Sequence, residues 1–233
     1  APTFNSSSPR WDFNSFDLGF SEEILERQGL RGTRLSHVVD TRFGNYTIKP
    51  SGTINPSPKF LGQWLVYALG GGNETAPAVA DVVPEFALLV DHTVDCYQIL
   101  GCKVDTMSLR FQAGQLIDCS VAMVAKTISG NETFTSAALG TTRAYEPYQS
   151  ADVAFAFDLG GLVPVLLDGE LTINNGLTAR NAIGNLAADE IFPGNRRMVR
   201  FLGRAAFNAD SLALVNDYIG AGASGGNSAT ITL

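Results

Sequence analysis

The segment 166–174, LLDGELTIN, alternates between apolar and polar positions along the chain. Strict alternation is typical of a half-buried β-strand, and the polar side of this one is acidic. The next residues, Asn-Asn-Gly, predict the end of the strand, because they tolerate left-handed backbone conformations. The apolar positions are Leu167, Gly169, Leu171 and Ile173, and the polar positions are Asp168, Glu170 and Thr172.

The pattern changes to helical spacing in the segment 56–72, PSPKFLGQWLVYALGGG. Large apolar residues recur there every three or four positions, as on the buried face of an amphipathic helix. Pro56 and Pro58 suit a first helical turn, and Asn55 or Ser57 can cap it. The three glycines at 70–72 stop the helix. This segment predicts the main helix of the fold.

A hairpin is predicted over residues 102–125, with its turn at Ala113-Gly114. In that register Leu109 pairs with Asp118. The cysteines at 102 and 119 then fall on an apolar face, where small core residues are expected. The opposite face is predicted to hold Asp105, Met107, Leu109 and Asp118.

Further elements follow towards the end of the chain. Residues 151–159 and 162–174 predict a second hairpin about Gly160-Gly161. Residues 196–207 predict a strand rich in arginine, and residues 208–222 predict a helix capped by Asn208 or Asp210. Residues 228–233 open a last strand that stops at Leu233, which indicates a short strand or a missing tail segment.

The first fifty residues are less regular. Residues 1–20 mix aromatic with small polar residues, which indicates an arm that docks either on its own core or on a neighbour. Residues 21–28, SEEILERQ, begin like a capping box and predict a short helix. The basic residues of 31–50 predict a long loop or a protruding hairpin. We therefore expect a single domain, 1–233, of mainly β (α+β) type: an antiparallel β-sandwich or barrel flanked by one main helix.

Composition narrows the range of functions. The chain is 45% hydrophobic and carries a net charge of −7, with the acidic excess between residues 71 and 195. An acidic protein is poorly suited to grip nucleic acid, because phosphate binding requires basic patches. That excess predicts solvated surface, or a field that repels phosphate, or subunits that stack end to end by charge complementarity.

Candidate catalytic chemistry is sparse. His37 and His92 each lie near an aspartate, which is usual for surface pairs, and neither belongs to a catalytic motif. The glycine-rich LGGGNETAP lacks the Gly-Lys-Ser/Thr of a phosphate-binding loop. The three cysteines and two histidines form no metal-ligand pattern. No catalytic residue, metal or cofactor is predicted.

Four blocks of sequence, taken in order, resemble the tail tube proteins (major tail proteins) of long-tailed bacteriophages. They are SGTINPSPKFLGQWLVYALGG, YQILGCKVDTMSLRFQAGQLIDCSVAMVAKTI, ADVAFAFDLGGLVPVLLDGELTINNGL and NRRMVRFLGRAAF. Each block alone is a weak signal, and their order and spacing carry the resemblance. It spans roughly residues 30 to 220.

The resemblance implies a structural virion protein, made in the host cytoplasm, whose six copies close a ring by continuing one sheet around a channel. Stacked rings would form a tube that conducts DNA. The implied partners are the tape measure protein, the tail terminator, baseplate or distal tail proteins, and a sheath protein if the tail contracts. DNA would pass without specific binding, and no membrane is involved.

Two sets of residues become candidates under this resemblance. Acidic groups that face the channel would repel passing DNA. The channel-facing candidates are Asp105, Asp118, Asp168 and Glu170, and ordinary outer surface is the alternative for them. The candidates for subunit or ring contacts are Trp11, Phe13, Arg31, Arg34 and Arg42.

Two rival classes of protein share parts of this pattern. A virion decoration or carbohydrate-binding β-sandwich would show the same alternation, but would expose an aromatic platform and would not stack without limit. An enzyme on a β-rich scaffold would need a pocket with converging titratable groups.

Overall fold

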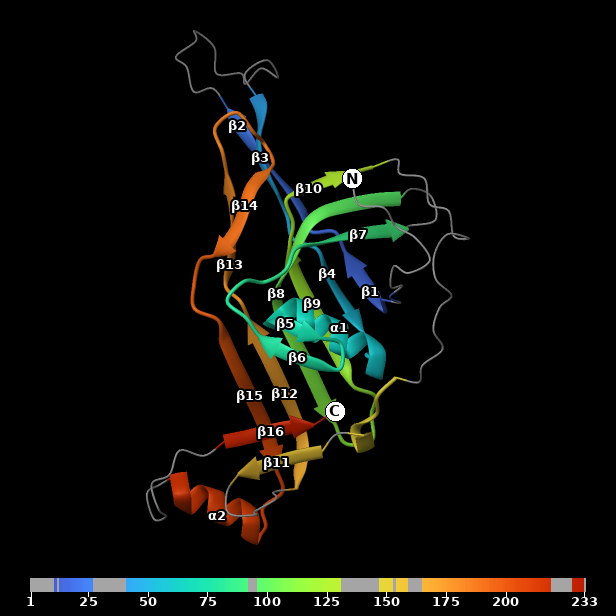
Figure 1. Cartoon of the computed structure of the whole chain (residues 1–233), viewed down its shortest axis with the longest axis vertical. Helices are drawn as coiled ribbons and strands as arrows, with labels where there is room; N and C mark the ends of the chain where they lie inside the picture. Colours follow the sequence, from blue (N-terminus) through green and yellow to red (C-terminus); the bar gives the residue numbers. More distant parts are fainter. Residues whose placement is uncertain are drawn as a thin grey trace, which may run out of the picture.

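Strands make up most of the described chain, and two α-helices accompany them (Figure 1). The computed structural model describes residues 11, 13–26, 41–91, 96–130, 147–152, 154–158, 165–218 and 228–232. The helices are α1 (Pro58–Leu69) and α2 (Ala209–Tyr218). The strands are β1 (Ser15–Asp17), β2 (Phe20–Glu26), β3 (Thr41–Ile48), β4 (Ser51–Ile54), β5 (Gly70–Asn73), β6 (Ala76–Val79), β7 (Phe86–Asp91), β8 (Cys96–Gln112), β9 (Asp118–Val124), β10 (Thr127–Ser129), β11 (Ala154–Asp158), β12 (Leu166–Asn174), β13 (Leu177–Asn181), β14 (Ala188–Pro193), β15 (Met198–Ala205) and β16 (Ser228–Thr232).

One antiparallel sheet organises the molecule. Its neighbouring strands follow the order β1-β4-β9-β8-β12-β15, and β7 and β10 pair with the first part of β8. The hairpins β2–β3 and β13–β14 lie towards one end of the long axis, and α2 lies towards the other (Figure 1). The predicted mainly β fold with one main helix is confirmed.

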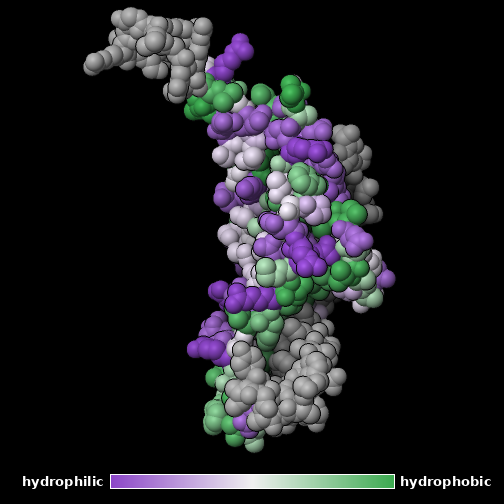
Figure 2. Space-filling model, turned by 90° about the vertical axis from the view of Figure 1, so that its left-hand side faces the viewer, coloured by the Kyte–Doolittle hydropathy of each residue, from purple (hydrophilic) through white to green (hydrophobic). Residues whose placement is uncertain are grey.

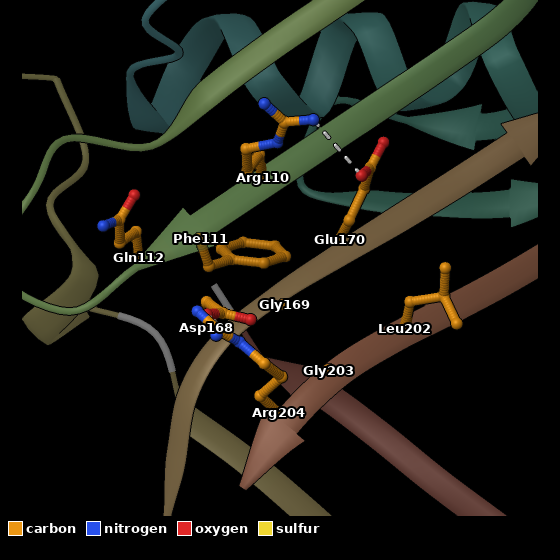
Figure 3. Close-up of a pocket in the computed structure, with 9 residues that line it drawn as sticks. All are labelled: Arg110, Phe111, Gln112, Asp168, Gly169, Glu170, Leu202, Gly203 and Arg204. Carbon is orange, nitrogen blue, oxygen red and sulfur yellow. Dashed lines mark hydrogen bonds and ion pairs between the residues drawn. The ribbon is translucent and has the colours of Figure 1, made fainter.

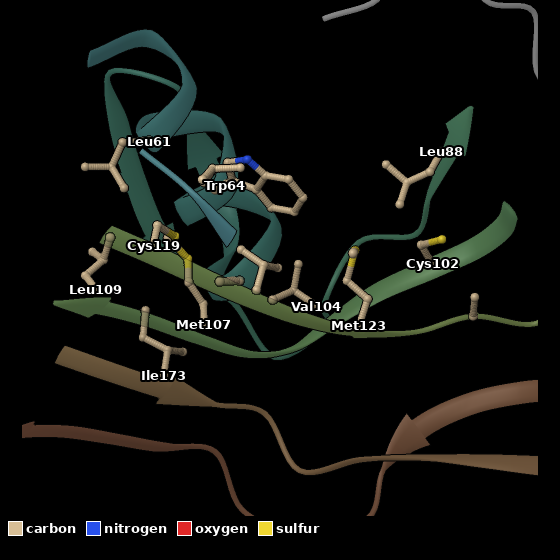
Figure 4. Close-up of a cluster of buried hydrophobic side chains, with 14 of the residues drawn as sticks. Leu61, Trp64, Leu88, Cys102, Val104, Met107, Leu109, Cys119, Met123 and Ile173 are labelled. Carbon is tan, nitrogen blue, oxygen red and sulfur yellow. The ribbon is translucent and has the colours of Figure 1, made fainter. Parts of the chain in front are cut away.

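Helix α1 has the predicted limits. Ser57 is its N-cap residue and Pro58 occupies the first turn, where a missing backbone N–H has no cost. Gly70 ends the helix with φ at 99°, a left-handed conformation that favours glycine, and its N–H donates to the Val66 carbonyl. In Figure 4 the helix lies over the sheet and directs Trp64 towards it.

The core forms between α1 and the strands β8, β9 and β12. Trp64 is fully buried, and the ring of Trp11 lies 4.5 Å from it, measured between centroids. All three cysteines are free and buried, which confirms the prediction for Cys102 and Cys119. Burial raises the pKa of the Cys102 and Cys119 thiols to about 12.

The β8–β9 hairpin is confirmed, but its predicted register is wrong beyond a β-bulge at Asp105. Leu109 pairs with Cys119 rather than with Asp118. One extra residue in β8 exchanges the faces of all the side chains that follow it. The predicted register places Met107 and Leu109 on the face opposite the cysteines, but both side chains face the core instead.

The predicted hairpin between residues 151–159 and 162–174 is also wrong. Strand β12 pairs with β8 on one side and β15 on the other, so both of its edges are occupied. Strand β11 pairs instead with β16, the predicted last strand. Segments close in sequence often form a hairpin, which favoured that prediction. Strands β8 and β15, both longer than β11, instead take the backbone hydrogen-bonding groups on both edges of β12.

The predicted helix at 21–28 is a third error, since residues 20–26 form strand β2. This strand pairs with β3, and Ile24 lies opposite Phe43. Cross-strand pairing therefore overrides the local capping pattern. Residues 41–48 of the predicted basic loop belong to this hairpin, whereas residues 31–40 lie outside the described part of the chain.

A buried hydrogen-bond network fastens the end of α1 to the sheet. The side-chain amide of Asn175, 3% exposed, donates to the carbonyl oxygens of Ala68 and Val104. Arg197 donates from Nε to the Asn175 side-chain oxygen, and from Nη1 to the Leu69 carbonyl. The Asn-Asn-Gly stop is therefore also the point where β12, β15 and the helix are joined.

The C-terminal helix α2 begins as predicted. The side-chain oxygen of Asn208 accepts a hydrogen bond from the Ser211 backbone N–H at 2.8 Å, the geometry of an N-cap. In the described residues, neither helix has the length and apolar character needed to cross a membrane.

Candidate functional site

The sheet has one face against α1 and one face directed away from it. Leu109, Cys119 and Ile173 occupy the core side, so the residues that alternate with them point outward. We name this outward side the polar face. Its residues on the six strands of the sheet path are Ser15, Asp17, Ser51, Thr53, Thr106, Ser108, Arg110, Gln112, Asp118, Ser120, Ala122, Asp168, Glu170, Thr172, Asn174, Met198, Arg200, Leu202 and Arg204.

One row across the polar face consists of hydroxyl side chains. Ser15, Thr53, Ser120, Ser108 and Thr172 are successive Cα partners across five strands, and Arg200 follows on β15. The hydroxyl oxygens of the first two lie 2.7 Å apart. The five hydroxyl residues are uncharged and rich in hydrogen-bonding groups, and the row ends at the charged Arg200.

The next row places Arg110 between two carboxylates. Its Cα partners are Asp118 on β9 and Glu170 on β12. Arg110 Nη2 lies 3.5 Å from Glu170 Oε2. Asp118 in turn accepts a hydrogen bond from the Asn55 side-chain amide at 2.8 Å. Both carboxylates of this row therefore have partners.

Asp168 is paired in the same way. Arg204 donates from Nε and Nη2 to its Oδ2 atom, across the β12–β15 pair. These hydrogen bonds hold the pKa of Asp168 below its ordinary value and raise the pKa of Arg204. Because Arg204 is exposed and Asp168 is only half-buried, solvent screens much of this attraction.

The polar face is close to electrical balance as a consequence. Its arginines are Arg110, Arg200 and Arg204, and its carboxylates are Asp17, Asp118, Asp168 and Glu170. The acidic face predicted from β12 alone is thus largely neutralised by arginines on β8 and β15. Sequence reasoning missed these three arginines as part of the site. The alternation of 198–205 signals a shared face for Arg200 and Arg204, but it does not identify the partner strand.

A shallow hollow of about 460 Å³ lies over the two ion pairs of β12 (Figure 3). Gly169 and Gly203, which are cross-strand partners, contribute backbone to its lining. The charged groups around it neutralise one another, so the hollow offers hydrogen bonds more than net charge. No cluster that could hold a metal ion occurs among the described residues.

Asp105 is separated from the other three carboxylate candidates. Its Oδ1 atom accepts a hydrogen bond from the Leu177 backbone N–H at 2.6 Å, and its carbonyl accepts one from Asn175. The bulge therefore directs Asp105 to the start of β13. The structure brings together Asp118, Asp168 and Glu170, and it does not bring Asp105 to them.

The contact candidates have different environments. Trp11 and Phe13 pack against Trp64 of their own chain, at centroid distances of 4.5 and 6.2 Å. Their contact with another subunit stays a prediction. Arg42 is exposed on β3, opposite Leu25. The other two candidates, Arg31 and Arg34, lie outside the described residues, as do His37 and His92.

Comparison with known proteins gives one finding about the whole chain. A family model described as "Phage tail tube protein" matches residues 1–232. No curated protein matches the chain.

Proposed function

The chain belongs to the phage tail tube protein family, and we propose that six copies close into a ring whose channel is lined by the polar face. Rings stack into the tail tube, and DNA passes through the channel during ejection. The family is one of structural components of the virion tail, and its members assemble into a tube with other tail proteins.

The arrangement of the sheet is the observation that carries this proposal. One face is sealed by α1 and the core, whereas the other presents hydroxyl groups and paired charges. A face that must contact water and moving DNA needs polar groups, but it must not bind phosphate strongly. Balanced ion pairs meet both requirements.

The same arrangement changes the expected role of the carboxylates. Asp118, Asp168 and Glu170 line the channel in this proposal, with arginines as their partners. They act mainly by preventing those arginines from binding phosphate, and only secondarily by repelling DNA. The tape measure protein fills the channel during assembly, and terminator and distal tail proteins close the ends of the tube. A sheath surrounds the tube if the tail is contractile.

Negative-stain electron microscopy of the purified chain at rising concentration tests the assembly. We expect rings with a central hole, or tubes of uniform width. Sonicated fragments of the tubes, added to fresh protein, should extend. Where no tubes form, purified tail tips are added to the protein as an initiator. Discrete monomers or trimers at every concentration, with no growth from these tips, would contradict the proposal. In that case glycan binding is the next assay, because it tests the decoration or carbohydrate-binding alternative.

A further inference from the structure

Strand β15 is an open edge with apolar side chains on both of its faces. Within the described residues it pairs only with β12. Met198, Val199 and Leu202 are 60%, 57% and 51% exposed. On the side of the molecule where β14 and β15 lie in Figure 1, hydrophobic and hydrophilic patches alternate over the surface (Figure 2). A strand of eight residues with these properties invites pairing with another strand.

The two edges of the sheet carry opposite charge. Residues 194–205, GNRRMVRFLGRA, contain four arginines and no acidic residue. Residues 15–26, SFDLGFSEEILE, contain four acidic residues and no basic one. They form β1, the other edge of the sheet, which carries Asp17, and the following strand β2, which pairs with β3 in a separate two-stranded sheet and carries the other three acidic residues. Within a ring, such edges attract one another.

Several of these charges have no ion pair within the described part of the chain. Arg196 and Arg200 on the basic edge are exposed, as are Asp17 and Glu22 on the acidic edge. Arg197 and Arg204 already have partners within the chain, because they donate hydrogen bonds to Asn175 and Asp168 respectively. The exposed charges are therefore available to a second molecule.

Strand direction is compatible with joining these edges. Five antiparallel steps separate β1 from β15, so the two strands run in opposite directions. If neighbouring subunits of the ring are related by rotation about an axis roughly parallel to the strands, each strand keeps its direction from one subunit to the next. Strand β15 of one copy would then lie antiparallel to β1 of its neighbour. If the rows continue without a shift, Arg200 faces Ser15 and lies diagonal to Asp17, within reach of a long side chain.

We propose that the basic β15 edge of one subunit pairs with the acidic β1–β2 edge of a second copy. This pairing specifies the side-to-side contact in the ring and rests on the proposed function. The competing contact is a two-fold pair of β15 strands, which would place arginine against arginine and leave the acidic edge open. Charge disfavours that arrangement.

Cross-linking between two single-substitution proteins tests the pairing. Ser15→Cys places a thiol on β1, and Leu202→Cys places one on β15, both on the polar face. The proteins are assembled separately and as a mixture, then treated with a short bismaleimide. The wild type serves as control, because its native cysteines are buried. We expect a cross-linked dimer only in the mixture.

Each outcome decides a different point. A cross-linked dimer in the sample that contains only Leu202→Cys means that the β15 strands of two copies lie side by side, which overturns the inference. Rings without the mixed dimer overturn the inference and leave the tube in place. The mixed dimer without rings or tubes supports the pairing and overturns the proposed function. Neither rings nor dimer overturns both.

Charge reversal supplies an independent readout. Arg196→Glu with Arg200→Glu removes the net positive charge of the basic edge, and Asp17→Arg with Glu22→Arg removes the net negative charge of the acidic edge. We expect each double variant to assemble only at a protein concentration about tenfold higher than the wild type requires. The variant that combines all four substitutions has the wild-type net charge and again places opposite charges at the exchanged positions, so it should assemble like the wild type. Unchanged assembly of both double variants, with unfolding temperatures like that of the wild type, would overturn the pairing.

Discussion

Arg204 of β15 donates from Nε to Oδ2 of Asp168 on β12 at 2.7 Å, across the cross-strand pair. The contact shows that the acidic side of β12 cannot be understood from that strand alone. Its charge is balanced by the neighbouring strand, and Arg110 plays the same part for Glu170 from the other side. The first two predictions follow from this pairing.

Removing the carboxylates should convert the channel from a neutral surface into one that retains DNA. In Asp168→Asn with Glu170→Gln, Arg110 and Arg204 lose their partners and become available to phosphate. We expect duplex DNA to sediment with the assembled tubes at low salt and to be released as salt rises. The reverse variant, Arg110→Gln with Arg204→Gln, should retain none.

Glu190 provides the matched control for this experiment. It forms an ion pair with Arg180 on the β13–β14 hairpin, off the polar face. Glu190→Gln should leave DNA retention at the wild-type level. Equal retention in the control and in the double variant would show that the polar face does not line the channel.

The Asp168 pair should also give a defined dependence of stability on pH. Hydrogen bonds from Arg204 lower the pKa of Asp168 in the folded chain below its ordinary value of 3.8. The stabilisation is therefore present above that ordinary value, and it is lost as pH falls through the lowered pKa. We expect the wild type to be slightly more stable than Asp168→Asn at neutral pH, with the difference vanishing in acid. Urea unfolding across this pH range measures it.

The Asn175→Ala variant should be strongly destabilised. The buried amide donates to two carbonyl oxygens and accepts from Nε of Arg197, so its loss removes these three hydrogen bonds from a buried site, and Arg197 keeps only the bonds of its Nη1 atom. We expect the free energy of unfolding to fall by about 2–3 kcal/mol. Urea unfolding of the unassembled chain measures this, with Asn181→Ala as the control, because that half-buried amide donates to one carbonyl oxygen, that of Leu186. A loss no larger than that of the control would mean that the network contributes little.

Gly169→Ala should be costly because of one aromatic ring. A methyl group at Gly169 would lie 2.9 Å from Cζ of Phe201, closer than such atoms approach. We expect a loss of about 1–3 kcal/mol in the free energy of unfolding. In a Phe201→Leu background the same substitution should cost less, and a double-mutant cycle isolates the difference. An equal loss in both backgrounds would assign the cost to the backbone instead.

The cysteine thiols of the folded chain should resist modification. Burial raises the pKa of Cys102 and Cys119 to about 12, so almost no thiolate exists near neutral pH. We expect an aromatic disulfide reagent at pH 8 to label neither thiol until denaturant is added. Mass spectrometry after digestion identifies the labelled positions. Rapid labelling of either thiol in the folded chain would contradict the burial.

The sequence by itself determined those features that depend on neighbouring residues. The limits of α1 follow from helical spacing, Pro58 and Gly70, and the end of β12 follows from Asn-Asn-Gly, where Gly176 has φ at 59°. The β15 strand, the Asn208 cap and the burial of the cysteines were predictable for the same reason. Helical periodicity, capping and alternation act within a few residues, so they can be recognised along the chain.

Only the tertiary structure decided which strands meet and in which register. The bulge at Asp105 moved Met107 and Leu109 into the core, and pairing with β3 made a strand of a segment with a helical start signal. The arginine partners of Asp168 and Glu170 come from strands more than thirty residues away. Such contacts depend on the free energy of the whole sheet, because one inserted residue or one alternative neighbour changes every pairing that follows.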